Sequence, residues 1–155
     1  MNSLKIRFYK KEISRIAKKY KIVFVILFGS RARMEKPNSE TDLDIAVLAK
    51  KETDYKLFGK LFSEFSDVFR GENVDVRFLN GSNLLFRHSV VRDGILLYGD
   101  ENKYLEYKLL TIKRYVDDGK KYFPALRILI DRKLENLQKG LASPEDVEIF
   151  LRLST

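Results

Sequence analysis

Apolar residues in the first thirty positions change from helical spacing to an unbroken run. Ile13, Ile16, Ala17 and Tyr20 recur at helical spacing and predict an amphipathic helix that ends near Tyr20. All residues from Ile22 to Phe28 are apolar, which is typical of a strand buried on both faces. Gly29 follows and predicts the end of that strand.

Two further strands are predicted where apolar and polar residues alternate, at 42–48 and 73–79. The two-residue period places Asp42 and Asp44 on one face of the first, and Asp75 on the polar face of the second. The leucines and phenylalanines between the two strands recur at helical spacing from Leu57 to Phe69, which predicts a helix whose phenylalanines belong to the core.

The rest of the chain predicts a short helix, a short strand and a helical tail. The helix is expected over 84–92 and ends at Gly94, and the strand over 95–98. In the tail, an apolar stripe runs along one helix, and Pro124 is expected to break or restart it before a second helix that ends near Gly140. The stripe consists of Leu105, Leu109, Ile112 and Val116. A last short helix is expected from Ser143.

Size and composition predict a single soluble domain. The chain has 155 residues, 45% hydrophobic and 34% charged. Its longest apolar run is too short to cross a bilayer, and the first residues show no signal-peptide pattern, so we expect a cytoplasmic protein without a membrane partner. The absence of cysteine and the single histidine, His88, exclude a disulfide, a thiol nucleophile and a multi-histidine zinc site.

The net charge of +8 is concentrated at the N-terminus. Residues 1–41 carry 11 Lys or Arg against 3 Asp or Glu, whereas 42–100 carry 8 against 10. A basic N-terminal face favours polyanions, but an ordinary solvated helix face explains the lysines equally well. Since no nucleic-acid motif accompanies them, a nucleic acid is not a required partner.

Three aspartates and one turn are the candidate chemistry. Gly29-Ser30 could let the backbone approach a phosphate, although many turns have this sequence. Two aspartates on one strand face, Asp42 and Asp44, suit Mg²⁺ or Mn²⁺, or they could pair with Arg31 and Arg33.

Asp75 completes the set if its strand lies beside that of Asp44. Three carboxylates around two cations could clamp a triphosphate. The alternative is an ion pair between Asp75 and Arg77 on the same face.

These residues, in this order, resemble the minimal nucleotidyltransferase family of the polymerase-β superfamily. The resemblance rests on Gly29-Ser30-Arg31-Ala32-Arg33, Thr41-Asp42-Leu43-Asp44-Ile45 and Val74-Asp75-Val76, and covers residues 10 to about 100. It implies an α/β (α+β) fold, a mixed sheet flanked by helices, with a catalytic core over 1–100. The helical tail over 101–155, entered by Tyr104-Leu105-Glu106-Tyr107, is similar to that of MntA-type members and is expected to pack on or near the core.

The resemblance also implies roles for single residues. Gly29 and Ser30 would hold the β- and γ-phosphates of ATP, and Arg33 would contact phosphate. Asp42 and Asp44 would bind two Mg²⁺ ions, and Asp75 would complete the second metal site and help deprotonate the acceptor hydroxyl. Two positions depart from the family's pattern: Met34 stands where glycine is usual, and residues 31–41 make a spacer of eleven residues where ten are usual.

In MntA-type proteins the acceptor is a tyrosine of a HEPN-fold ribonuclease toxin, HepT. The resemblance therefore implies a type VII antitoxin that silences such a toxin with AMP. Two alternatives stay open: AMP transfer to a small molecule or a nucleic-acid end, and a non-catalytic module that neutralises its partner by contact.

Two other features are interpreted as structural. His88 is expected to be a capped or surface residue of its helix. Tyr104, Tyr107 and Tyr115 could form a partner-binding strip, but helix packing is the simpler interpretation.

Overall fold

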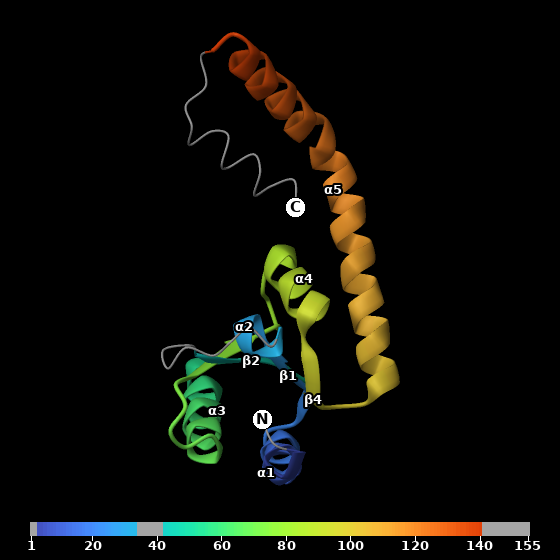
Figure 1. The fold of residues 1–155 in the computed structure, drawn as a ribbon. Helices are drawn as coiled ribbons and strands as arrows, with labels where there is room; N and C mark the ends of the chain where they lie inside the picture. The colour runs from blue at the N-terminus through green and yellow to red at the C-terminus, as the bar shows by residue number, and fades with distance from the viewer. Residues whose placement is uncertain (1–2, 34–41, 141–155) are drawn as a thin grey trace. The chain divides into compact units, whose positions relative to one another are not determined.

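A computed structural model describes residues 3–33 and 42–140 of the chain (Figure 1). The helix expected from Ser143 lies outside these residues. Along the chain, the order is helix α1 (Ser3–Lys19), strand β1 (Ile22–Phe28), helix α2 (Gly29–Ala32), strand β2 (Leu43–Ala49), helix α3 (Tyr55–Val68), strand β3 (Val74–Phe78), helix α4 (Leu84–Asp93) and strand β4 (Ile95–Tyr98). Helix α5 (Glu101–Gln138) follows.

The four strands form one mixed sheet in the order β3-β2-β1-β4. Strand β1 pairs antiparallel with both β2 and β4, whereas β2 and β3 are parallel. The parallel pair needs a crossover, which α3 supplies, and Asp54 caps the start of that helix by accepting a hydrogen bond from the amide of Leu57. The predicted mixed sheet flanked by helices is confirmed.

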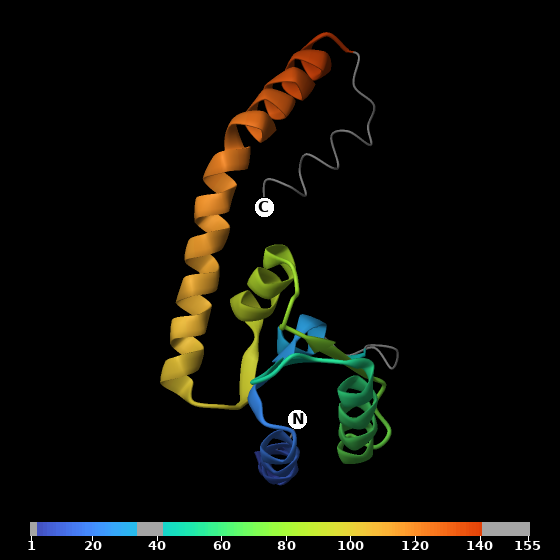
Figure 2. The same cartoon turned by 180° about the vertical axis from the view of Figure 1, so that it is seen from behind.

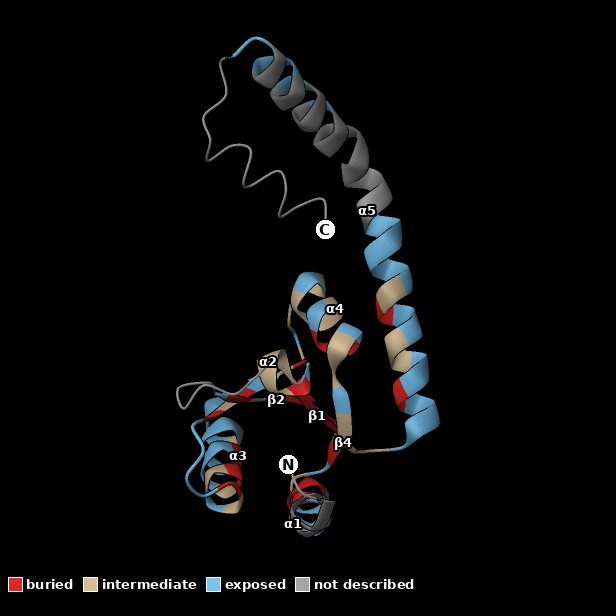
Figure 3. Cartoon of the chain, viewed as in Figure 1, coloured by how far each residue is buried: buried red, intermediate tan, exposed pale blue. Residues whose placement is uncertain are grey.

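Both faces of the sheet are covered, because β1 contributes side chains to two cores. On one face, Val25 and Leu27 lie in a cluster with residues of α1 and α3. On the other, Phe24 and Ile26 lie with Val90 and Val91 of α4 and with the start of α5. Both views show α1 and α3 on the same side of the sheet (Figure 1 and Figure 2), and buried positions gather on the strands and on the helix sides that face them (Figure 3).

Helix α5 continues through the position where a break was predicted. It is helical from Glu101 to Gln138, so the expected break at Pro124 is wrong. A proline inside a helix removes one backbone hydrogen bond, and the remaining bonds on either side keep this helix continuous. Gly140, with φ +67°, follows its end as predicted.

The chain divides into two compact units within α5, Met1–Lys113 and Arg114–Thr155. The sequence placed a boundary near residue 100, before the helix starts. The first turns of α5 fall in the first unit because Tyr104 and Tyr107 pack with Phe24 of β1. None of the described helices is long and apolar enough to cross a membrane.

Only part of the predicted apolar stripe of α5 packs on the sheet. Tyr104 and Thr111 are buried there and Ile112 is partly buried, whereas Leu105 and Leu109 are 53% and 58% exposed. Helical packing of Tyr104 and Tyr107 is confirmed. Both tyrosine rings contact the ring of Phe24 on this side of the helix.

The phenylalanines of α3 are also divided between core and surface. Phe65 and Phe69 are buried as predicted, but Phe58 and Phe62 are 38% and 43% exposed and stack on each other. Helical spacing placed all of them on one stripe, but the side of α3 that packs in the core runs through Leu57, Leu61 and Phe65, and Phe58 and Phe62 lie beside it.

Glu64 joins α3 to α1 through three hydrogen bonds. Its carboxylate accepts from Lys19 Nζ at 2.5 Å, from the Tyr20 hydroxyl at 2.9 Å and from Arg15 Nη2 at 3.1 Å. The hydrogen bond from Lys19 is the main reason that the pKa of Glu64 is lowered. Arg15 and Lys19 lie on the last turns of α1 and Tyr20 directly follows it, so Glu64 fixes that end of the helix against α3.

We predict that Glu64→Gln lowers the free energy of unfolding by about 1 kcal/mol at pH 7, because the amide loses charge-assisted bonds on a partly exposed surface. A carboxylate with a lowered pKa stabilises the fold above its unfolded pKa, about 4.3, and this contribution disappears as pH falls through the lowered value. Urea unfolding should therefore show a difference between the two proteins that shrinks from about pH 5 towards about pH 3. Glu52→Gln, on an exposed loop residue, is the control, and an equal effect there would contradict the assignment.

Candidate active site

The register of three neighbouring strands brings the candidate residues onto one line across the sheet. Phe28, the last residue of β1, lies opposite Asp44 in β2, and Asp44 lies beside Asp75 in β3. Because side chains alternate along a strand, the burial of Leu43 and Ile45 against α1 and α3 directs Asp44 to the opposite, α4-covered face. The strands of Asp44 and Asp75 are adjacent, which meets the condition set for Asp75 to join the other two aspartates.

Gly29 follows Phe28 and is in close contact with the Asp44 carboxylate. Its φ is +74°, a conformation that favours glycine. A Cβ at this position would collide with Asp44 Oδ2 and lie 3.1 Å from Asp44 Cγ. The missing side chain therefore allows the turn into α2, with Ser30 as its second residue, to pass directly over Asp44.

The environment of Asp44 is electrostatically unfavourable for its own charge. Burial raises the pKa of Asp44, and the negative charges of Asp75 and Asp42 raise it further. Arg77 and Arg33 oppose this shift and do not cancel it. Such a site gains stability from a bound cation, which removes the repulsion.

The other two aspartates are held by protein partners. Asp42 lies one residue before β2 and accepts a hydrogen bond from Asn73 Nδ2 at 2.6 Å. Asp75 lies 3.4 Å from Arg77 Nε, the ion pair left open by the sequence. Across residues 3–33 and 42–140, no three acidic or histidine side chains form a group ready to hold a metal ion. The three carboxylates share a neighbourhood without pointing at one centre.

Arginines surround the acidic residues. Arg33 ends α2, and its guanidinium lies 3.8 Å from Asp93 of α4. The guanidinium of Arg77 lies over the ring of Phe86, 5.4 Å from its centre. Arg31 donates to Glu72, in the turn before β3.

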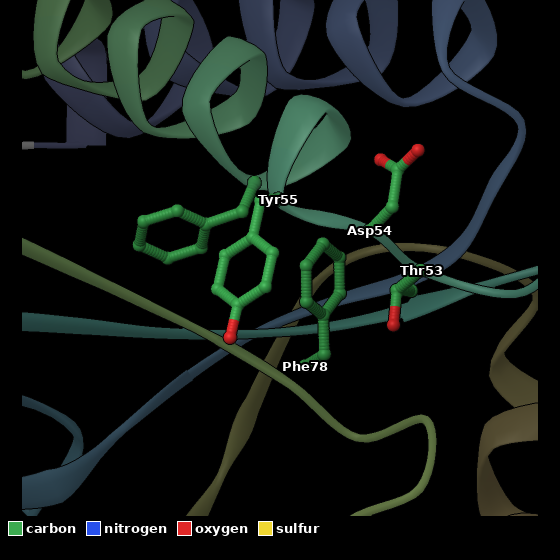
Figure 4. A pocket seen from close by; sticks show the side chains of 5 residues that line it. Thr53, Asp54, Tyr55 and Phe78 are labelled. Carbon is green, nitrogen blue, oxygen red and sulfur yellow. The ribbon is translucent and has the colours of Figure 1, made fainter.

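A pocket of about 420 Å³ lies elsewhere, at the carboxyl ends of β2 and β3 (Figure 4). It is lined by Thr53, Asp54, Tyr55, Phe58 and Phe78. Phe78 packs with the cluster of the α1 and α3 face, whereas Asp44 and Asp75 face α4. None of the predicted site residues lines this pocket, so its shape gives no support to the aspartate site.

The structure thus brings together Gly29, Asp44 and Asp75 through strand register. Asp42 contributes to the charge at Asp44, and Arg33 does so from the end of α2. The sequence interpretation missed Asn73, which directly precedes β3 and contacts Asp42, the residue directly before β2. Its only signal was an amide residue at the start of the strand that carries Asp75. His88 is half-buried on α4, which lowers its pKa, and it is not among the residues at Asp44.

A family model identifies this four-stranded mixed sheet as that of a nucleotidyltransferase. Residues 11–103 match the family described as polymerase beta, nucleotidyltransferase. The chain belongs to this family, as the resemblance implied. No curated protein matches the sequence.

Solved structures with the same fold include toxin–antitoxin complexes. A chain of the MntA–HepT complex aligns with a TM-score of 0.61 at 20% identity, covering 80% of this chain and 98% of that chain. A toxin–antitoxin structure with AMP-PNP aligns with a TM-score of 0.65 at 21% identity, covering 78% and 98%. A complex of a tri-AMPylated Shewanella oneidensis HEPN toxin with an MNT antitoxin aligns with a TM-score of 0.62 at 20% identity, covering 81% and 98%. At these identities the likeness shows the fold.

We predict that Gly29→Ala destabilises the protein more than Gly81→Ala does, by about 1 to 3 kcal/mol, because only the first forces a methyl group into Asp44. Gly81 is a matched control, since its φ is +66° and a Cβ there meets nothing within 4 Å. Both variants bear the backbone strain of alanine at positive φ. Thermal unfolding gives the stability difference, and equal losses would contradict the contact with Asp44. Titration with AMP-PNP and Mg²⁺ should show weakened binding for Gly29→Ala alone.

Proposed function

We propose that this protein is a Mg²⁺-dependent adenylyltransferase that moves AMP from ATP to a tyrosine of a HEPN-type toxin, and so acts as a type VII antitoxin in the cytoplasm. The observation that carries the metal-dependent part is the Asp44 carboxylate, seated against Gly29 and flanked by Asp75 and Asp42. The neighbours in toxin–antitoxin complexes, one with AMP-PNP and one with an AMPylated toxin, support the acceptor.

The residues fit Mg²⁺ by chemistry and by charge. Carboxylate oxygens are the ligands that Mg²⁺ takes in phosphoryl-transfer sites, and the raised pKa of Asp44 reports repulsion that a cation relieves. Asp42 and Asp44 would hold the ions, and Asp75 would complete the second position once it releases Arg77. Bound there, Mg²⁺ neutralises charge on the triphosphate; Mn²⁺ suits the same ligands.

The chain's own groups position the two reactants. Gly29 and Ser30 would receive the β- and γ-phosphates over the start of α2, with Arg33 close to them. Asp75 would accept the proton of the acceptor hydroxyl. The hydroxyl oxygen then forms a bond to the α-phosphorus, the bond from that phosphorus to the bridging oxygen breaks, and pyrophosphate leaves.

We predict that Asp44→Asn reduces AMP transfer on the order of a thousandfold, since the loss of a metal ligand removes several kcal/mol of transition-state stabilisation. The same variant should unfold at a higher temperature without metal. Burial and the neighbouring negative charges disfavour the Asp44 carboxylate in the folded state at neutral pH, and the neutral amide removes that penalty. Asp67→Asn, on an exposed residue of α3, is the matched control and should change neither quantity.

The assay incubates the protein with ATP, Mg²⁺ and the product of the neighbouring gene, which is then weighed by mass spectrometry. The expected result is the addition of AMP to that product, mapped to a tyrosine. An unmodified product would refute the proposed acceptor. If Asp44→Asn still neutralised the toxin, the protein would act by contact and not by catalysis.

A further inference from the structure

Two consecutive residues in the turn before β3 contact both sides of the candidate site. Glu72 accepts a hydrogen bond from Arg31 Nη2 at 2.5 Å, and Arg31 lies in α2, next to Ser30. Asn73 donates from Nδ2 to Asp42 Oδ1 at 2.6 Å. Arg31 and Asp42 lie on either side of residues 34–41, so this turn bridges two parts of the site that are separate in sequence.

Asn73 holds the start of β2 with its backbone as well as its side chain. Its carbonyl oxygen accepts a hydrogen bond from the amide of Leu43 at 2.7 Å. Asp42 precedes the first residue of β2 and therefore has no place in the strand ladder. The side chain of Asn73 fixes the carboxylate that the sheet itself does not fix.

We propose that Glu72 and Asn73 form a clasp that positions the nucleotidyl-transfer site: Asn73 orients Asp42 as a metal ligand, and Glu72 holds α2, with Gly29 and Ser30, through Arg31. This inference rests on the proposed metal site. A hydrogen bond to one carboxylate oxygen leaves the other free for a cation and restricts its rotation, which is how outer partners of a metal site raise its affinity. Asn73 suits this role because its amide nitrogen donates without adding a charge that would compete with the metal.

The two residues of the clasp contact different parts of the site, so their loss should have different effects. Asn73 contacts Asp42, a proposed metal ligand, so the loss of its side chain should weaken metal binding. Glu72 contacts Arg31 in α2, the helix that begins at Gly29, so the loss of its carboxylate should weaken binding of the triphosphate and change metal affinity less. A turn that was only structural would affect both equally, through stability.

The chain offers a matched control for Asn73. Asn80, after β3, joins the other end of β2: it donates to the carbonyl of Ala49 and accepts from the amide of the same residue. The two asparagines thus bridge β2 at opposite ends, and only Asn73 touches an aspartate of the site. Asn80→Ala should lose stability with no change in metal affinity.

The test measures Mn²⁺ affinity of the full chain from the electron paramagnetic resonance signal of free Mn²⁺, without nucleotide or acceptor. Asn73→Ala should bind Mn²⁺ about tenfold more weakly than the unaltered protein. Asn73→Leu, which is similar in size, should also bind more weakly, because it loses the donor to Asp42 without adding a charge. Glu72→Gln should raise the dissociation constant of AMP-PNP more than that of Mn²⁺. In the transfer reaction, Asn73→Ala should raise the Mg²⁺ concentration needed for half-maximal rate more than it lowers the rate at saturating Mg²⁺.

The outcomes distinguish a failure of the clasp proposal from a failure of the proposed metal site. Unchanged Mn²⁺ affinity in both Asn73 variants would refute the clasp proposal without contradicting the proposed metal site. An equal loss in Asn80→Ala would also overturn it, since the effect would then come from stability, which thermal unfolding of the same samples measures. If the unaltered protein bound no Mn²⁺, the metal site and the clasp would both fall.

Discussion

The register between β1 and β2 places Phe28 opposite Asp44, and the positions of the other candidate residues depend on it. A shift by one residue would turn Asp44 into the core formed with α1 and α3 and would turn Leu43 and Ile45 out of it. The alternation within β2 prevents that shift, because Leu43, Ile45 and Val47 are buried in that core and Asp44 lies between them. The apolar core therefore determines which face carries the acidic residues.

The contact between Gly29 and Asp44 adds a local requirement to that register. Glycine lets the chain leave β1 with a positive φ and pass over a carboxylate without a side chain between them. The result is a half-buried negative charge that is raised in energy by Asp75 and Asp42. This is a common property of functional sites: the folded chain carries an unfavourable charge arrangement that a bound cation relieves.

The chain also keeps its acidic residues occupied by its own donors. Asn73 holds Asp42, and Arg77 pairs with Asp75 while its guanidinium lies over Phe86. Of these partners, Arg77 opposes the rise in the pKa of Asp44. Among the described residues, no three acidic or histidine side chains form a group ready to hold a metal ion. The turn before β3 is also part of the site, since this turn contacts α2 through Glu72 and the start of β2 through Asn73.

The sequence by itself determined the elements and the candidate chemistry. The apolar run of β1, the alternation in β2 and β3 and the order of Gly29, Asp42, Asp44 and Asp75 predicted the sheet and its family, because strand periodicity and residue type are local properties. Only the tertiary structure decided which partners the side chains take. Leu105 and Leu109 of α5 face outwards because Tyr104 fills the space at Phe24. Phe58 and Phe62 are exposed because α3 packs through the neighbouring side that carries Leu61 and Phe65. Asn73 meets Asp42 across a parallel strand pair. These contacts join residues far apart in the chain, and their choice depends on packing over the whole sheet, which no spacing along one element records.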